Sequence, residues 1–443
     1  MRRRSAPLLS RTGRGLALFA ALAIALPCTA QAGQVVNSDG LRLNLGGDIK
    51  GFFDVFFPYE HLLMPEDPVP SAALDFRFKF EGSYKRAFSW QFHHSATASI
   101  NAQDALSSGL MASTRGAQAR EAINLSWALE QEGAFRLGGR IDRMMLGFHV
   151  PHLDLWLGRQ PLSFGTGYFF TPLDLISPYQ PQVVDREYKP GVDALRFDGF
   201  IGMSGHISAV VGVVDTFDRE GLFAVGNGGF TLGLFDLGLL VAYQQSDLVV
   251  GISTQGSVGP VGVHADLAVT APLPGEEEEE SREEPFARIV VGADVRTDFG
   301  LTAMAELYGQ TLGTRDPEDY LTVALSDRFT RGDLWTMGHL YLALTLSQEI
   351  LPILSVSMFG VLNVLDPSVL LGPSLSWSVA QNADFVVGGF VSVGKRPEAL
   401  TLTDLLNPDG TPLSAEEATA VIEPGSEFGL AGHQAYAQLK LYF

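Results

Sequence analysis

LRLNLGGDIKGFFDV, residues 41–55, alternates between apolar and polar side chains along most of its length. The odd positions carry leucine, glycine, isoleucine, phenylalanine or valine, whereas the even positions include Arg42, Asp48, Lys50 and Asp54. Successive side chains of a β-strand point to opposite faces, so this segment predicts a strand with one apolar and one charged face. Strands of soluble sheets usually have about 5 to 6 residues, and a tilted membrane-spanning strand needs about 9 to 11. The length of the segment therefore favours a membrane strand.

The same period of two returns in residues 74–84 and 88–93, which are joined by a short turn. Further strands are expected in the second half of the chain, at Ala287–Thr297, Leu301–Thr311, Leu334–Gln348, Ile353–Leu365, Val369–Ala380 and Phe385–Val393. Long polar connections alternate with short turns and are expected at Pro58–Ser71, Asn101–Ala119, Pro161–Pro190, Pro272–Pro285, Gly313–Gly332 and Lys395–Phe428. Short periplasmic turns and long extracellular loops are typical of outer-membrane barrels. The pattern predicts an all-β fold, a transmembrane antiparallel β-barrel of about 18 strands, with a range of 16 to 20.

Composition supports this architecture over a helical membrane protein. Apolar residues make up 46% of the chain and charged residues only 18%. Even so, no clean apolar run downstream of residue 32 reaches the roughly 18 to 20 residues of a membrane helix. Alternation alone also suits a soluble sandwich, in which the apolar face is buried and the polar face meets water. Strand length and the asymmetry of the connections favour the membrane barrel over the soluble sandwich.

The pattern of the first 32 residues predicts an export signal. They begin with several arginines, continue with an apolar stretch at 15–26 and end in Ala30-Gln31-Ala32, which suits a signal peptidase. We expect Sec-type export, cleavage after Ala32 and a single barrel domain over residues 33–443. A retained N-terminal anchor is the alternative, and Pro27 disfavours it.

The formal net charge of −20 argues against nucleic acid as a partner, because phosphates would be repelled. The basic signal segment contributes none of the acidic residues, so the remaining chain is more acidic still. The expected surroundings are instead the lipid bilayer and lipopolysaccharide of the Gram-negative cell outer membrane.

The C-terminal residues alternate as well, with Leu439, Leu441 and the terminal Phe443 on one face. This ending resembles the terminal-strand signature of Gram-negative outer-membrane barrels, although alanines stand at 435 and 437 in place of bulkier residues. The resemblance implies that Leu439, Leu441 and Phe443 are an assembly signal for the barrel assembly machinery.

A second resemblance lies in the middle of the chain. Gly158-Arg159-Gln160 ends a predicted strand, and a loop of about 30 residues containing Pro172-Leu173-Asp174 follows. This arrangement resembles uncharacterised porin-like and exopolysaccharide-secretion barrels of proteobacteria and myxobacteria. The resemblance implies an outer-membrane channel for polar solutes, or a pore for a secreted polysaccharide served by periplasmic polysaccharide-export components.

A loop of this length could fold into the lumen and narrow it. The candidate constriction residues carry mixed charges and are Arg159, Asp185, Arg186, Lys189, Asp193 and Arg196. Charges of both signs would impose a transverse field on polar solutes without selecting one sign strongly. The alternative is that these charges only attach the loop to the wall.

Catalytic and metal-binding motifs are not evident. His264 and Asp266 share one face of a strand, but no Gly-x-Ser-x-Gly or His-Glu-x-x-His pattern occurs. The acidic run at 276–280 is interpreted as a solvated loop. The five tryptophans fall in strand candidates and suit an interfacial girdle or wall packing. We therefore predict no enzyme, no cofactor and no metal; a plugged structural or surface-interaction barrel and an outer-membrane hydrolase remain the alternatives.

Overall fold

A computed structural model of the chain describes residues 33–38, 40–62, 64–101, 120–130, 135–178, 186–273, 284–400, 404, 411, 413 and 422–443. The predicted signal peptide and residues 102–119 of the expected loop Asn101–Ala119 lie outside this part of the chain. Among the described residues, no helix is long and apolar enough to cross a membrane.

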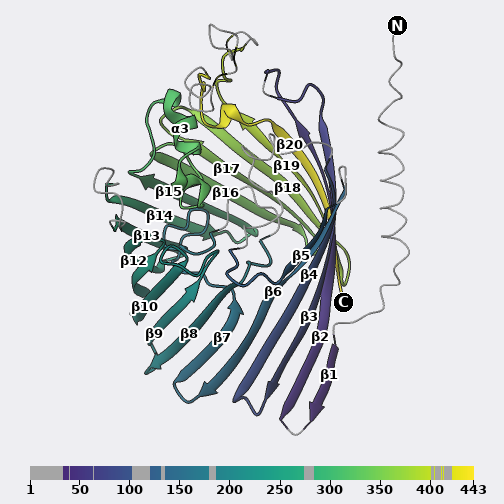
Figure 1. Ribbon diagram of the computed structural model, residues 1–443, viewed down its shortest axis with the longest axis vertical. Helices are drawn as coiled ribbons and strands as arrows, with labels where there is room; N and C mark the ends of the chain where they lie inside the picture. The colour runs from purple at the N-terminus through teal and green to yellow at the C-terminus, as the bar shows by residue number, and fades with distance from the viewer. Residues whose placement is uncertain are drawn as a thin grey trace.

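The described chain is one antiparallel sheet that closes on itself (Figure 1). The strands are β1 (Gly33–Ser38), β2 (Leu41–Phe57), β3 (Val69–Tyr84), β4 (Phe88–Asn101), β5 (Ser126–Glu130), β6 (Phe135–Val150), β7 (Leu153–Gln160), β8 (Val192–Ile201), β9 (Gly205–Val213), β10 (Leu222–Leu232), β11 (Phe235–Gln244), β12 (Asp247–Val258), β13 (Val261–Pro272), β14 (Phe286–Arg296), β15 (Leu301–Gln310), β16 (Leu340–Leu351), β17 (Leu354–Asn363), β18 (Ser368–Ala380), β19 (Ala383–Val393) and β20 (His433–Tyr442). Pairing of β2 with β20 closes the ring. The result is the predicted 18-stranded all-β barrel.

The short strands β1 and β5 each occupy the same position around the ring as a longer strand. β1 pairs with residues 41–45 of β2, and β20 pairs with residues 48–57 along the same edge of that strand. In the same way, β5 pairs with residues 136–140 of β6, beyond the point where β7 ends. This explains why 20 strands make a ring of 18.

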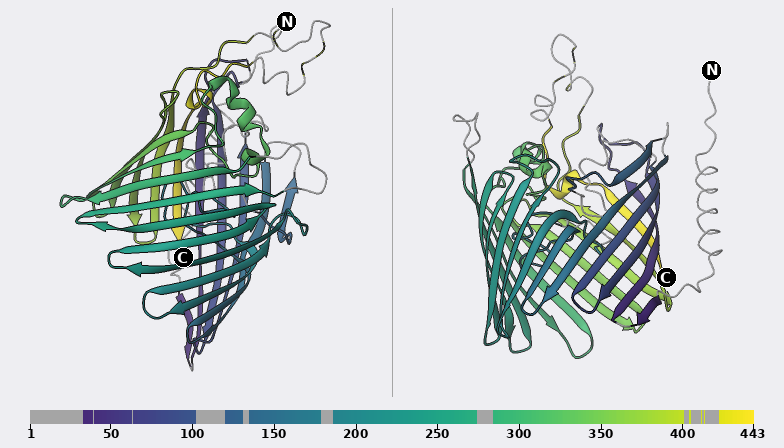
Figure 2. Two further views of the ribbon diagram at one scale, coloured as in Figure 1. Left: turned by 90° about the vertical axis from the view of Figure 1, so that its left-hand side faces the viewer. Right: turned by 60° about the horizontal axis from the view of Figure 1, so that its bottom comes forward.

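The strands run obliquely around the barrel, and the two ends differ in their connections (Figure 2). Residues 85–87, 151–152, 202–204 and 297–300 make tight turns at one end. The other end carries most of the long connections, including 161–191 and 311–339, although β11 and β12 are joined there by only two residues. The predicted alternation of short turns and long loops is confirmed.

Side-chain exposure follows the period of two along each strand. In β11, Leu239 and Val241 are 55% and 47% exposed, whereas Leu240 and Ala242 are 2% and 1% exposed. The exposed apolar row faces outward, where hydrocarbon would cover it, because water would not cover so many leucines and valines stably. The buried row faces a lumen that is partly filled by loops.

One strand prediction was wrong at its start. Residues 334–339 were expected in a strand, but β16 begins at Leu340 and Trp335 lies in the preceding connection. That connection contains η1 (Pro317–Asp319), α3 (Tyr320–Ala324) and α4 (Asp327–Thr330). Met337 there is buried with the loop residues Tyr320 and Leu430, and the sequence pattern does not distinguish burial in a loop from burial in a strand.

Candidate functional site

The connection between β7 and β8, residues 161–191, is here named the lumen loop. The structure describes its first arm, residues 161–178, and its second arm, residues 186–191, and both lie inside the barrel. Two inward-facing carboxylates hold its first arm through backbone N–H groups. Asp266 on β13 accepts bonds from Thr166 at 2.8 Å and Gly167 at 2.9 Å. Hydrogen bonds to an ionised acceptor are worth about 1.5 to 3 kcal/mol each, so this attachment is strong.

Glu306 on β15 holds the next three residues of the same arm. Its carboxylate accepts backbone N–H bonds from Tyr168 at 2.7 Å and from Phe169 and Phe170 at 2.9 Å. It also bonds His264 Nε2 at 2.7 Å. Three consecutive amides on one carboxylate fix the backbone path of the loop.

Aromatic packing reinforces this attachment. The fully buried Phe170 ring stacks on Tyr308 with centroids 4.4 Å apart and an interplanar angle of 4°. The Trp335 ring stacks on the other face of the Phe170 ring, with centroids 5.0 Å apart. The first arm of the lumen loop is thus packed as a protein core against β15 and the 311–339 connection.

An ion pair joins the two arms of the loop. Lys189 Nζ lies 2.5 Å from Asp174 and donates to Ser163 Oγ at 2.9 Å. Both charged side chains are buried, at 6% and 7% exposure. A buried charge is retained only with its partner, so the pair holds the loop in one conformation.

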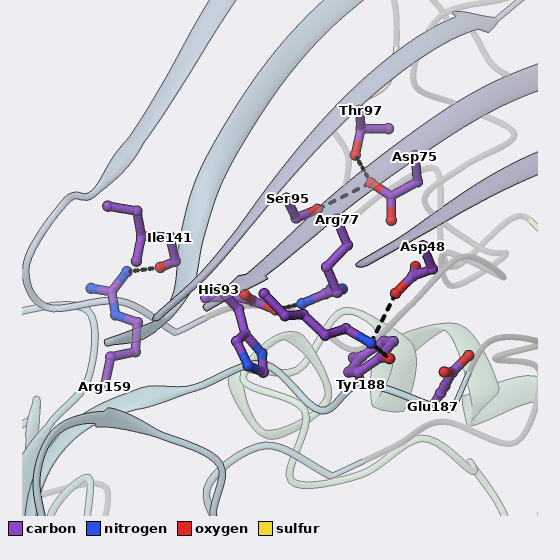
Figure 3. A network of polar contacts seen from close by, with 12 residues as sticks. Asp48, Asp75, Arg77, His93, Ser95, Thr97, Ile141, Arg159, Glu187 and Tyr188 are labelled. Carbon is purple, nitrogen blue, oxygen red and sulfur yellow. Dashed lines mark hydrogen bonds and ion pairs between the residues drawn. The ribbon is translucent and has the colours of Figure 1, made fainter. Parts of the chain in front are cut away.

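The second arm contacts the opposite wall of the barrel (Figure 3). The Tyr188 ring lies 4.7 Å from Lys50 Nζ, 4.2 Å from the Arg77 guanidinium and 4.3 Å from Lys79 Nζ. Beside it, Glu187 pairs with Lys50 at 2.9 Å. Since β2 and β3 lie across the lumen from β13 and β15, the loop spans the interior.

The charges at this contact are set by their neighbours. Burial raises the pKa of Glu187, but the hydrogen bond and charge of Lys50 outweigh it and hold the pKa below its usual value. Burial and the carboxylates of Asp48 and Glu187 raise the pKa of Tyr188. At neutral pH Glu187 is therefore an anion and Tyr188 is a neutral ring that attracts the three cations.

Arg159 and Asp193, two of the predicted constriction residues, form a pair inside the wall. Arg159 is 1% exposed and bonds Asp193 through Nε at 3.0 Å and Nη2 at 2.8 Å. Its Nη1 donates to the Ile141 carbonyl at 2.9 Å, and Glu121 lies 3.0 Å away. Figure 3 shows Arg159 and Ile141 away from the Tyr188 contact. This network joins β6, β7 and β8 with the segment before β5.

Of the remaining constriction candidates, Lys189 and Arg186 belong to the lumen loop and Arg196 belongs to β8. Lys189 belongs to the ion pair with Asp174, and the Arg186 guanidinium lies 5.7 Å from the Phe169 ring centroid. Arg196 pairs with Asp198 at 2.8 Å and lines a cavity of about 530 Å³ under the loop. Asp185 lies outside the described residues. The structure thus brings Lys189 and Arg186 into the lumen loop but does not gather all six into one ring.

Sequence reasoning missed the wall residues that hold the loop. The available signal was that Glu306, Lys50, Arg77 and Lys79 alternate with apolar neighbours, which predicts an inward side chain. Their contacts to the loop depend on strand pairing far along the chain. Among the described residues, no group of three or more His, Cys, Asp or Glu side chains could hold a metal ion.

No family model matches the chain, and no curated protein matches its sequence. Solved structures do match its fold. OccAB3 of Acinetobacter baumannii is 9% identical, with a TM-score of 0.53, covering 90% of this chain and 99% of that one. The chain has the fold of outer-membrane porins.

Two Pseudomonas aeruginosa structures agree. OccD3 (OpdP) is 9% identical with a TM-score of 0.51, covering 95% of this chain and 96% of its own. OccK2 (OpdF) is 9% identical with a TM-score of 0.53, covering 90% and 97%. The predicted porin-like barrel is confirmed as a fold, and the predicted resemblance to exopolysaccharide barrels gains no support from these matches.

Proposed function

We propose that this porin-fold chain is an outer-membrane channel through which small polar solutes diffuse past the lumen loop. The observation that carries the proposal is the attachment of that loop to opposite walls, through Glu306 on one side and Lys50 on the other. A loop fixed at both sides narrows a lumen that an 18-stranded barrel otherwise leaves wide.

The charges around the lumen loop favour polar solutes without a strong preference for one sign. Lys50, Arg77 and Lys79 face Tyr188, while Asp48 lies 3.1 Å from Lys79 and Glu187 pairs with Lys50. Positive and negative groups this close produce a field across the passage that orients dipolar solutes. In this proposal Arg186 and Arg196 face the path of the solute, and the pair of Arg159 and Asp193 stabilises the barrel wall.

Export of a secreted polysaccharide by periplasmic partners is the larger-solute alternative. It would require the lumen loop to leave the lumen, which means breaking its bonds to Asp266 and Glu306 and the buried Asp174–Lys189 pair. These contacts favour solutes small enough to pass a fixed loop.

The proposed location is the outer membrane, in contact with lipid and lipopolysaccharide, after signal-peptide cleavage. The proposed assembly signal is Leu439, Leu441 and Phe443, which the barrel assembly machinery would read. In support, the Phe443 ring stacks on Phe76 of β3 with centroids 6.0 Å apart, on the apolar outer face.

Single-channel recording in planar bilayers tests the proposal. The folded mature chain should give discrete conductance steps, and deletion of residues 161–190 should give larger ones. Heat-modifiable gel mobility verifies folding of both proteins. A folded barrel that never conducts would support the plugged structural barrel, and equal conductance after deletion would remove the lumen loop from the mechanism.

A further inference from the structure

Three inward-facing side chains near the short-turn end of the barrel form a continuous hydrogen-bond chain. Ser89 Oγ lies 2.8 Å from His149 Nε2, and His149 Nδ1 lies 2.8 Å from Asp154 Oδ1. The serine is on β4, the histidine on β6 and the aspartate on β7. The two imidazole nitrogens thus contact a hydroxyl on one side and a carboxylate on the other.

We propose that Ser89, His149 and Asp154 form a second functional site, a nucleophile, base and orienting carboxylate that hydrolyse small water-soluble esters. This goes beyond the proposed channel function. Such a constellation is recognised by the roles and distances of its members and not by their order in the chain. A base is within reach of a nucleophile at about 2.6 to 3.2 Å, which both distances satisfy.

Strand register builds this geometry. His149 and Asp154 are directly paired across β6 and β7, next to the turn that joins these strands. Ser89 is paired with Gly147, two residues before the histidine on β6. The serine therefore reaches the imidazole diagonally, across a position that carries no side chain.

Gly147 is essential to this approach. A Cβ at that position would lie 2.3 Å from Ser89 Oγ and 2.6 Å from the Trp156 ring. Trp156 in turn packs edge-on against His149, with centroids 4.9 Å apart and planes at 75°. The glycine gives room for the serine, and the tryptophan limits rotation of the imidazole.

The site is open to the lumen. The His149 and Asp154 side chains are 23% and 27% exposed. Asp154 and Trp156 also line the cavity of about 530 Å³ beneath the lumen loop. Ser89 is partly exposed on the inward face of β4, whereas Trp90 and Phe92 occupy the outer face that lipid would cover. This is why the proposed substrate is a soluble ester and not a phospholipid.

The cavity also offers donors for a developing oxyanion. Gln91 and Arg143 both line it, and Gln91 follows Ser89 by two residues on the same face of β4. Arg143 Nε is buried and has no hydrogen-bond partner among the described residues. In this proposal the amide N–H of Gln91 is the donor to the negative charge that develops on the ester oxygen, because the Arg143 Nε atom is buried.

The chemical step balances without a cofactor. Ser89 Oγ attacks the ester carbonyl carbon while its proton passes to His149 Nε2, and Asp154 stabilises the imidazolium that results. The carbon–alkoxy bond breaks, and the leaving alcohol takes the proton from His149. Water then attacks the acyl-serine and gives a proton to His149. The bond between the acyl carbon and Ser89 Oγ breaks, His149 returns the proton to Oγ, and the carboxylic acid leaves.

Covalent labelling of the full mature barrel with a fluorophosphonate tests the site. An activated Ser89 displaces fluoride and gains the phosphonyl group, which peptide mass spectrometry locates. We expect one adduct, on Ser89, that is lost in Ser89→Ala and forms at least about 100-fold more slowly in His149→Gln. Hydrolysis of p-nitrophenyl acetate should fall in parallel in both variants.

Ser357→Ala is the matched control, because Ser357 is another inward serine in a hydrogen bond, at 2.7 Å from Ser374 Oγ. It should keep full labelling and hydrolysis. Folding is checked by heat-modifiable mobility, and bilayer conductance of Ser89→Ala should equal that of the wild type, which separates this proposal from the channel. A folded wild-type barrel without an adduct on Ser89, or unchanged ester hydrolysis in Ser89→Ala, would overturn it.

Discussion

Glu306 Oε2 accepts a hydrogen bond of 2.9 Å from the backbone N–H of Phe170, although the two residues are 136 positions apart in the chain. This bond fixes the lumen loop to the wall. We expect Glu306→Gln to weaken the attachment, because an amide carries no charge and one fewer acceptor. Single-channel conductance should rise and become noisier. Asp384→Asn is the control, because its carboxylate bonds Ser378 away from the loop; equal conductance in both variants would contradict the role of Glu306.

The buried pair of Asp174 and Lys189 should be sensitive to loss of one partner. Asp174→Asn leaves the Lys189 ammonium buried without its carboxylate, which costs about 3 to 5 kcal/mol for pairs of this kind. We expect faster tryptic cleavage after Arg186 in the folded barrel. Asp174→Asn combined with Lys189→Met removes both charges and should be cleaved more slowly than the single variant. Equal cleavage of wild type and Asp174→Asn would show that the pair does not hold the loop.

Tyr188 should affect the ion selectivity of the channel. Tyr188→Leu removes the aromatic face that contacts three cations, each contact being worth about 0.5 to 2 kcal/mol. Lys50, Arg77 and Lys79 then interact more strongly with mobile anions, and the reversal potential in a KCl gradient should shift toward chloride. Tyr168→Leu is the matched control, since that side chain is 70% exposed on the same loop. A shift of the same size in both variants would remove the specific role of Tyr188.

The last long connection should loosen as pH rises. Burial raises the pKa of Glu427 to about 7, despite bonds donated by Tyr341, Met337 and Asn363 that favour the charged form. A folded pKa above the unfolded value of 4.5 adds stability that is complete below 4.5 and lost as pH rises through 7. The full shift corresponds to about 3 kcal/mol.

Hydrogen exchange of residues 422–430 measures this effect. Protection, corrected for the intrinsic pH dependence of exchange, should be greater at pH 5 than at pH 8 in the wild type. In Glu427→Gln the neutral amide does not titrate, and the difference should disappear. A wild type with equal protection at the two pH values would contradict the raised pKa.

The C-terminal ring should matter for assembly. Phe443→Ala removes the stacking on Phe76 and the terminal aromatic of the proposed assembly signal. We expect a several-fold drop in folded barrel, measured as the heat-modifiable fraction in outer membranes. Phe299→Ala, at a turn where the ring is 70% exposed, is the control and should assemble normally.

Strand positions were largely predictable from local pattern. The alternation at residues 41–55 lies within β2, and the expected strand at 301–311 matches β15 within one residue. The pattern failed at residues 334–339, where apolar side chains pack in a loop. It also could not foresee Phe52, an apolar residue at an inward position, which stacks on Tyr436 inside the lumen.

The candidate site was less predictable. Pro161–Pro190 was expected as a long loop able to enter the lumen, and its charged residues were named. Their partners were not, because Glu306 and Lys50 meet the loop only after the sheet has closed. The hydrogen bond between Ser89 and His149 spans 60 residues of sequence and depends on the register of β4 and β6.

The all-β class, the approximate strand number and the division between an apolar outer face and a polar inner face could all be predicted from the order of the amino acids. These follow from a two-residue period and from turn residues, which are local properties of the backbone. Which polar side chains face one another across the lumen, and where the lumen loop is held, became known from the folded barrel. Those contacts depend on pairings between strands far apart in the chain, because closure of the ring places every inward side chain in one enclosed space.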